Sequence, residues 1–161
     1  MTTEEYNKAV DTYSDGVYRF ILKNIRNTDK AKDIVQDTFE KLWINVKNVN
    51  FEKVKSYIFT TAYHTMIDSI RKNKRIVSFE QADQSDYSTN RSYSDVGEIL
   101  NKAIAKLPED QRSVILLRDY EGYSYDEISE ITGLSEAQVK VYIYRARVFL
   151  KEFIGSMSVL V

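Results

Sequence analysis

Cationic side chains cluster at two places where they could bind the phosphates of a nucleic acid. The first is RKNKR at 71–75, and the second is the segment 138–151, whose four charged residues are all basic. A polyanion responds to the local field of such a cluster rather than to the net charge of the chain, which is −1. Cations are also favoured at the C-terminal ends of helices by the helix dipole. The charges alone leave phosphate binding and solvated helix ends as equal alternatives.

The side chains that metal, redox or covalent chemistry requires are scarce. The chain of 161 residues contains no Cys and a single His, His64. This excludes disulfides, thiolate metal sites, a cysteine nucleophile and a histidine-rich metal site. The sequence has neither a Gly-rich phosphate loop nor a recognisable Ser–His–Asp arrangement. His64 and Asp68 lie one helical turn apart, but no nucleophile accompanies them. We therefore expect a protein that is not an enzyme and that uses neither a cofactor nor a metal.

The composition indicates a helical protein. With 43% hydrophobic and 29% charged residues the chain is typical of globular proteins. Five Gly and one Pro are few for a sheet protein, which needs many tight turns. No stretch approaches the roughly 18 apolar residues of a membrane span, and the N-terminus lacks the features of a signal peptide. We expect an all-α protein in the cytoplasm, with no membrane insertion of this chain.

Three helices are predicted in the N-terminal part, over residues 4–25, 29–46 and 53–73. The second shows the clearest periodicity, because its apolar side chains recur at i, i+3, i+4 and i+7. Either Asn27 or Thr28 is suited to cap it. The expected buried stripe of this helix consists of Ala31, Ile34, Val35, Thr38, Phe39, Leu42, Trp43 and Val46.

Residues 76–93 separate these helices from a second helical block. The segment is rich in Ser, Asp, Gln and Asn, is acidic and lacks helical periodicity. That composition predicts a flexible acidic linker. Four shorter helices are expected after it. Ser94 caps the first, and Pro108 opens the second, which ends at Gly122.

The last two helices have the pattern of a helix-turn-helix. Two capping boxes, Ser124 with Glu127 and Ser135 with Gln138, mark their starts, and Gly133 forms the turn between them. The apolar residues expected to lock the two helices together are Ile128, Ile131, Leu134 and Val139. A short helix, a turn and a longer helix form the DNA-binding motif. An ordinary helical hairpin is the alternative that this pattern leaves open.

Three runs in the C-terminal block carry a family resemblance. They are LPEDQR at 107–112, LLRDYEGYSYDEI at 116–128, and LSEAQVK at 134–140, followed by Arg145 and Arg147. These runs closely resemble the C-terminal domain of bacterial RNA polymerase sigma factors. Their order and spacing are similar to those of the small extracytoplasmic-function (ECF) group.

The N-terminal block agrees with this resemblance independently. The run DIVQDTF at 33–39, with Leu42 and Trp43, is similar to the helix with which that group binds core polymerase. The runs YIFTTA at 57–62 and IDSIRK at 67–72 are similar to its promoter-melting helix. Two motif sets in the family's order make coincidence improbable.

The resemblance implies an alternative sigma factor that binds core RNA polymerase, directs it to promoters and helps to open the DNA. Residues 1–75 would form an N-terminal helical domain for core binding and for recognition and melting of the minus-ten element. Residues 76–93 would be the linker. Residues 94–161 would form the helix-turn-helix domain for the minus-thirty-five element. The expected partners are the beta-prime and beta subunits of core polymerase, promoter DNA and an anti-sigma factor.

The site residues implied by the resemblance fall into three sets. An acidic and polar face suited to cationic side chains of the beta-prime clamp helices consists of Asp33, Gln36, Asp37 and Glu40. Contacts to the minus-ten DNA come from a polar loop at 47–52 and the helix that follows it, through Asn48, Asn50, Phe51, Tyr63, His64, Arg71 and Lys72. Contacts to the minus-thirty-five DNA come from the recognition helix, through Ser135, Glu136, Gln138, Lys140, Tyr144, Arg145 and Arg147.

Several aromatic positions depart from the family pattern or have another structural explanation. Tyr63 and His64 stand where the family often has Arg and Asn. Tyr142 and Tyr144 make the recognition helix more aromatic than usual. Phe59 is as suited to the core as to a DNA contact. The family pattern therefore predicts neither the promoter sequence that this chain recognises nor which single residues contact bases.

Three alternatives concern single residues and the class of protein. Asn48 and Asn50 are each equally suited to shaping a turn. Arg145 and Arg147 lie about 200° apart around a helix, so we expect one of them to face acidic neighbours in its own domain. A stand-alone helix-turn-helix regulator is the alternative class. It would explain residues 123–150 but not the N-terminal motifs.

Overall fold

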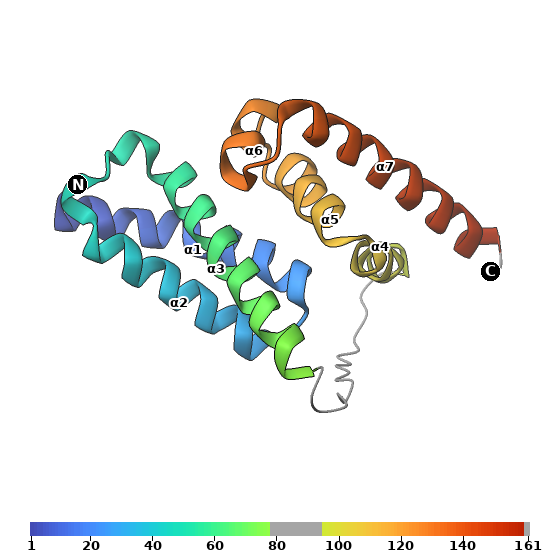
Figure 1. Cartoon of the computed structure of the whole chain (residues 1–161), viewed down its shortest axis with the longest axis horizontal. Coiled ribbons are helices and arrows are strands. Elements are labelled where there is room, and N and C mark those ends of the chain that lie inside the picture. Colours follow the sequence, from blue (N-terminus) through green and yellow to red (C-terminus); the bar gives the residue numbers. More distant parts are fainter. Residues whose placement is uncertain (78–94, 160–161) are drawn as a thin grey trace. The chain divides into compact units, whose positions relative to one another are not determined.

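The computed structural model describes residues 1–77 and 95–159, and its elements are all helical (Figure 1). The all-α prediction is thus confirmed for these residues. The chain divides into two compact units, Met1–Tyr87 and Ser88–Val161. The predicted linker at 76–93 lies outside the described residues except for 76–77, which end a helix, and the predicted cap Ser94 lies outside them as well.

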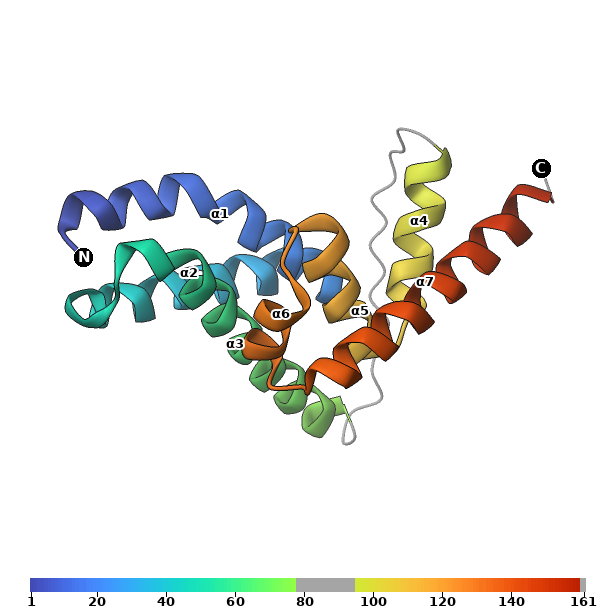
Figure 2. The same ribbon diagram turned by 90° about the horizontal axis from the view of Figure 1, so that it is seen from above.

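The N-terminal unit is a bundle of three helices, α1 (Thr3–Ile25), α2 (Thr28–Ile44) and α3 (Val54–Val77), each of which contacts the other two (Figure 2). Their buried side chains form the core, in which the rings of Phe20 and Phe59 meet edge to face at 5.8 Å. This burial resolves the alternative for Phe59 in favour of the core.

Of the two residues proposed to cap helix α2, Asn27 is the N-cap. The Asn27 side chain accepts a hydrogen bond from the Lys30 backbone N–H, at 3.0 Å. The predicted buried positions Ala31, Ile34, Thr38, Phe39 and Leu42 are confirmed. Trp43, however, is 48% exposed and lies at the edge of the stripe, where its ring meets that of Tyr6 at 5.0 Å. The stripe therefore ends earlier than its periodicity predicts.

Two short 3-10 turns connect α2 to α3, where the sequence predicts a loop. They are η1 (Val46–Asn48) and η2 (Phe51–Lys53). The amino group of Met1 donates to the carbonyl oxygens of Val46 and Val49, at 2.8 and 3.1 Å. The connection is therefore bonded to the start of α1.

The C-terminal unit contains α4 (Asp95–Lys106), α5 (Glu109–Ile115), η3 (Leu116–Tyr120), α6 (Tyr125–Thr132) and α7 (Glu136–Val159). Helix α7 packs against α4, α5 and α6. Its buried residues Val139, Ile143 and Ala146 face the core.

A π-helical turn, η3, continues α5 and ends the second predicted helix near Gly122. The Glu121 N–H donates to the Leu116 carbonyl at 3.1 Å, a bond of the i→i+5 type. Gly122 then adopts a positive φ of 77°, which a glycine adopts without steric strain. Pro108 lies at the N-cap, directly before α5, rather than in its first turn.

Candidate nucleic-acid and partner interfaces

The predicted core-binding residues form one exposed stripe on α2. Their spacing of i, i+3, i+4 and i+7 places them on one side of the helix, away from the buried stripe. All four are exposed: Asp33, Gln36, Asp37 and Glu40. Lys41 next to this stripe donates to the Thr65 hydroxyl of α3 at 2.9 Å. We call these four residues the acidic face. It presents three carboxylates and one amide, which suits cationic side chains.

The two asparagines of the connection between α2 and α3 differ in their bonding. The Asn50 side chain accepts from the Glu52 N–H at 3.1 Å and thereby caps η2. Asn48 is exposed, and within the described residues no hydrogen bond of its side-chain amide is recorded. The turn-forming alternative thus applies to Asn50, whereas Asn48 has an amide available for a ligand.

Helix α3 carries the other side chains predicted to contact the minus-ten DNA. His64, Arg71 and Lys72 are exposed. His64 and Arg71 are two turns apart and so lie on the same side of the helix. Tyr63, in contrast, is only 6% exposed, and its ring meets that of His64 edge to face at 5.4 Å.

The aromatic side chains near this DNA-contact set are therefore not equivalent. A buried ring offers no face for a base to stack on, so His64 rather than Tyr63 presents an accessible ring. Phe51 is half-buried, with the Lys8 ammonium 5.9 Å from its ring centre. Sequence periodicity did not separate Tyr63 from His64, because neighbouring positions at the edge of a helix face differ in burial only through tertiary packing.

The helix-turn-helix is built from α6 and α7, and both predicted capping boxes are present. The Ser124 hydroxyl accepts from the Glu127 N–H at 3.1 Å, and the Glu127 carboxylate accepts from the Ser124 N–H at 2.9 Å. Ser135 and Gln138 form the same pair of bonds at 3.1 and 3.0 Å. Gly133, with φ of 80°, makes the turn. Of the four locking residues, Ile128, Ile131 and Val139 are buried and Leu134 is half-buried.

The residues predicted to contact the minus-thirty-five DNA are all exposed on or beside α7. They are Ser135, Glu136, Gln138, Lys140, Tyr144, Arg145 and Arg147. Lys140 lies 3.8 Å from the Glu136 carboxylate. The Gln138 amide oxygen already accepts the bond that closes the capping box, so its NH₂ group is the part left to donate.

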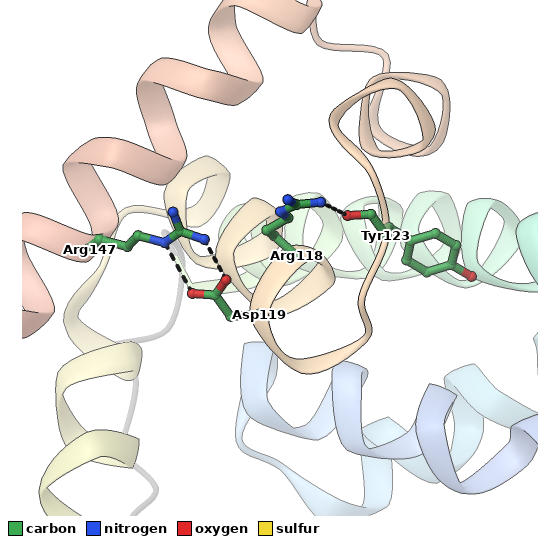
Figure 3. A network of polar contacts seen from close by, with 4 residues as sticks. All are labelled: Arg118, Asp119, Tyr123 and Arg147. Atoms are coloured by element: carbon green, nitrogen blue, oxygen red, sulfur yellow. Dashed lines mark hydrogen bonds and ion pairs between the residues drawn. The ribbon is translucent and has the colours of Figure 1, made fainter.

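Arg147 is paired within its own unit, as Figure 3 shows. Its guanidinium donates two hydrogen bonds to the Asp119 carboxylate, at 2.6 and 3.3 Å. The hydrogen bond to Asp119 raises the pKa of Arg147 above its ordinary value. Arg145 has no recorded ion pair among the described residues. The prediction that one of the two arginines faces an acid of its own domain is thus confirmed, and Arg147 is that arginine.

A second basic residue of the same region supports the turn before α6. Arg118 donates to the Tyr123 carbonyl at 2.8 Å (Figure 3), and Tyr123 is buried. The Tyr125 ring lies 4.6 Å from the Arg118 guanidinium carbon and 5.6 Å from the Lys140 ammonium. Tyr123 therefore packs in the core, whereas Tyr125 contacts two cations.

Within residues 1–77 and 95–159, His, Asp and Glu side chains form no group of three that could hold a metal ion. None of the helices described there is long and apolar enough to span a bilayer.

Comparisons with known proteins give the same family for both units. The family model for Sigma-70 region 2 matches residues 9–76, and the model for Sigma-70, region 4 matches residues 97–150. The chain is 31% identical over 144 residues to the ECF RNA polymerase sigma factor SigM of Bacillus subtilis, covering 86% of this chain and 88% of SigM. It is 32% identical over 141 residues to the RNA polymerase sigma factor SigV of the same organism, covering 86% and 84%.

Two solved structures have a similar fold. The sigma factor RpoE of Bartonella quintana, in complex with the anti-sigma factor NepR, matches with a TM-score of 0.82 at 24% identity, over 95% of this chain and 98% of RpoE. CnrH, in complex with the cytosolic domain of CnrY, matches with a TM-score of 0.67 at 20% identity, over 94% and 88%.

Proposed function

This chain belongs to the ECF group of RNA polymerase sigma factors, which direct the polymerase to promoters and are not enzymes, and we propose how its two units divide that work. Residues 1–75 bind core polymerase and open the minus-ten element. Residues 94–161 recognise the minus-thirty-five element. The observation that carries this division is the order of the two matches, region 2 at 9–76 and region 4 at 97–150, along one chain.

Core polymerase binds to the acidic face of α2. Four exposed polar side chains on one side of a helix, three of them carboxylates, provide charge complementarity for a cationic partner. The proposed partner surface is the clamp-helix region of the beta-prime subunit, with further contacts to the beta subunit. Because core polymerase is the partner, the proposed place of action is the cytoplasm.

The minus-ten element is opened by the connection between α2 and α3 together with the exposed side of α3. Asn48 offers both a donor and an acceptor to the edge of an extruded base. His64 offers a ring for stacking, and Arg71 and Lys72 offer charge for the phosphates. Asn50 supports this surface by capping η2, and Tyr63 of α3 supports it by packing in the core.

The minus-thirty-five element is recognised by α7 in the major groove. A recognition helix contacts base edges with its N-terminal turns and phosphates with flanking cations. The exposed residues Gln138, Tyr144 and Arg145 lie on the side of α7 opposite its buried residues. Arg147 instead contacts Asp119 and holds α7 against η3.

An anti-sigma factor is proposed as a further partner. The support is the similarity in fold to RpoE, which is held by the anti-sigma factor NepR. Since this chain contains no Cys, a thiol or zinc-thiolate switch would have to reside in such a partner rather than in this chain.

Run-off transcription tests the proposed function. Core polymerase with the full chain should start transcription at promoters selected from a random DNA library by the reconstituted holoenzyme, whereas core polymerase alone should not. The alternative, a stand-alone helix-turn-helix regulator, leaves the region 2 match unexplained. It predicts tight and specific DNA binding by the chain alone and no promoter-specific stimulation of core polymerase.

A further inference from the structure

The solvent-facing side of α7 is partly apolar. Within residues 97–156, the exposed large hydrophobic side chains all lie on this helix: Val141 at 43%, Tyr144 at 69% and Val148 at 38%. Their spacing of i, i+3 and i+7 places them on one side, opposite the buried Val139 and Ile143. Apolar carbon exposed along a single helix face is available for contact with a binding partner.

Val141 lies at the centre of this side and close to the start of the helix. Gln138 precedes it by three residues, and Arg145 follows it by four, so both flank it on the same face. The rise of an α-helix places Val141 about 7.5 Å from the start of α7 at Glu136, and Val148 about 18 Å from it. A major groove is about 12 Å wide and is contacted by the first turns of a recognition helix. Val141 is therefore within reach of base edges, and Val148 is beyond it.

The surroundings of Val141 favour DNA over an apolar protein partner. Segment 138–151 contains four basic residues and no acid. Arg145 is exposed, and no ion pair of its guanidinium is recorded within the described residues. A polyanion complements the Arg145 guanidinium beside Val141, whereas an apolar protein partner would have to desolvate it.

We propose that Val141 contacts the 5-methyl group of a thymine in the minus-thirty-five element and makes the protein prefer thymine at that position. A valine side chain has no hydrogen-bonding group, and the thymine methyl is the apolar feature that a base pair presents in the major groove. Tyr144 extends the apolar surface on one side of Val141, and Arg145 binds the DNA on the other. This inference rests on the proposed role of α7 in promoter recognition.

Deoxyuridine substitution tests the methyl contact directly. Deoxyuridine keeps every hydrogen-bonding group of thymidine and removes only the methyl. In promoters selected by the wild-type holoenzyme, each thymine of the minus-thirty-five element is replaced singly, and binding of the holoenzyme is measured. We expect one position at which affinity falls about fourfold, the effect of losing one buried methyl. In a Val141→Ala holoenzyme the same substitution should have no effect.

Val148→Ala is the matched control, because it removes the same groups from the same side of α7 two turns further on. It should keep the full deoxyuridine effect. Both valines are exposed, so neither change disturbs the core, and circular dichroism checks the fold. The proposal is overturned if the selected element has no thymine at a sensitive position, or if the deoxyuridine effect persists in Val141→Ala. It is also overturned if the two alanine variants behave alike, which would indicate a protein-binding stripe.

Failure of the methyl contact is distinguishable from failure of the proposed function. If wild-type holoenzyme transcribes from the selected promoters but shows no methyl effect that depends on Val141, only this inference is wrong. If wild-type holoenzyme selects no promoter and shows no preference in the minus-thirty-five element, both the role of α7 and the thymine contact are wrong.

Discussion

The ion pair between Arg147 and Asp119 decides which arginine of α7 is available to DNA. Because Arg147 is held by Asp119, we expect Arg145 to contact a phosphate. Arg145→Ala should weaken binding to all promoter sequences similarly and lower the slope of log affinity against log salt by about one. Holoenzyme binding across a series of salt concentrations measures this slope.

The control for this prediction is Arg147→Ala, which removes the same charge from the same helix. It should change the salt slope less than Arg145→Ala does. The lost pair with Asp119 is exposed, and such pairs contribute less than about 1 kcal/mol to stability. If the salt slope fell by about one in Arg147→Ala and did not change in Arg145→Ala, Arg147 rather than Arg145 would be the phosphate contact.

Asn48 and Asn50 should separate base capture from turn formation. Flipping a base costs a few kcal/mol, so the loss of a captured base affects opening more than docking. Asn48→Ala should reduce transcription from duplex promoters, and a premelted, mismatched bubble should restore part of it. Run-off transcription on both templates measures the difference.

Asn50 provides the contrast, because its side-chain oxygen caps η2. Asn50→Asp keeps this acceptor and removes the amide donor, so it should transcribe from duplex DNA like the wild type. Wild-type activity of Asn48→Ala on duplex DNA would leave the connection with a structural role only.

Binding of core polymerase should depend on the charge of the acidic face of α2 rather than on the net charge of the chain. Asp37→Arg places a cation among Asp33, Gln36 and Glu40, so we expect loss of affinity for core polymerase with an unchanged circular dichroism spectrum. Asp15→Arg, at an exposed position of α1, changes the net charge by the same amount and should bind normally. A pull-down with core polymerase compares the two. Equal binding by both variants would remove this face from the interface.

At the scale of elements, the turn of the helix-turn-helix depends on a single backbone conformation. Gly133 has a positive φ, and an added Cβ would meet no atom within 4 Å. Gly133→Ala should therefore destabilise the C-terminal unit by about 1–2 kcal/mol through the backbone rather than through a clash. Gly155 lies in α7 with open space around it, so Gly155→Ala should instead stabilise by up to about 1 kcal/mol. Thermal unfolding should show these opposite signs, and a decrease of equal size in both would contradict the backbone explanation.

Local sequence signals predicted the helices and their starts more accurately than their pairing. Capping is a matter of residues three apart, so Asn27, Ser124 and Ser135 were found from the sequence. The π-helical turn η3 and the bond between Asp119 and Arg147 were not. Those two side chains lie 28 residues apart, and only the packing of α7 against α5, which η3 continues, brings them together.

For the candidate site, the sequence likewise predicted what depends on the period of a helix but not what depends on packing between helices. Exposure of the acidic face follows from the period of α2, because its four residues alternate with the buried stripe. The burial of Tyr63 and the partial exposure of Trp43 do not follow from it, since both lie at stripe edges where neighbouring helices decide. The exposure of Val141 does not follow from the pattern of α7 either, because an apolar side chain in a helix is expected to face the core.

At the scale of the whole molecule, a net charge of −1 gives little long-range attraction to DNA. We therefore expect promoter recognition to depend on polymerase, which would hold the C-terminal unit near the DNA and raise its effective concentration there. The two units should therefore affect different parameters of transcription, although each acts on the same promoter.

To test this division, transcription is measured while the concentration of the chain is raised at fixed concentrations of core polymerase and promoter. Asp37→Arg should shift the midpoint of the titration to higher concentration and reach the wild-type plateau, because the defect lies in assembly. Arg145→Ala should keep the midpoint and lower the plateau at a limiting promoter concentration, because the assembled holoenzyme binds DNA less well. In the double variant the two effects should add, since Asp37 and Arg145 lie in different units of the chain. A lowered plateau without a shifted midpoint in Asp37→Arg would place the acidic face in promoter opening rather than in core binding.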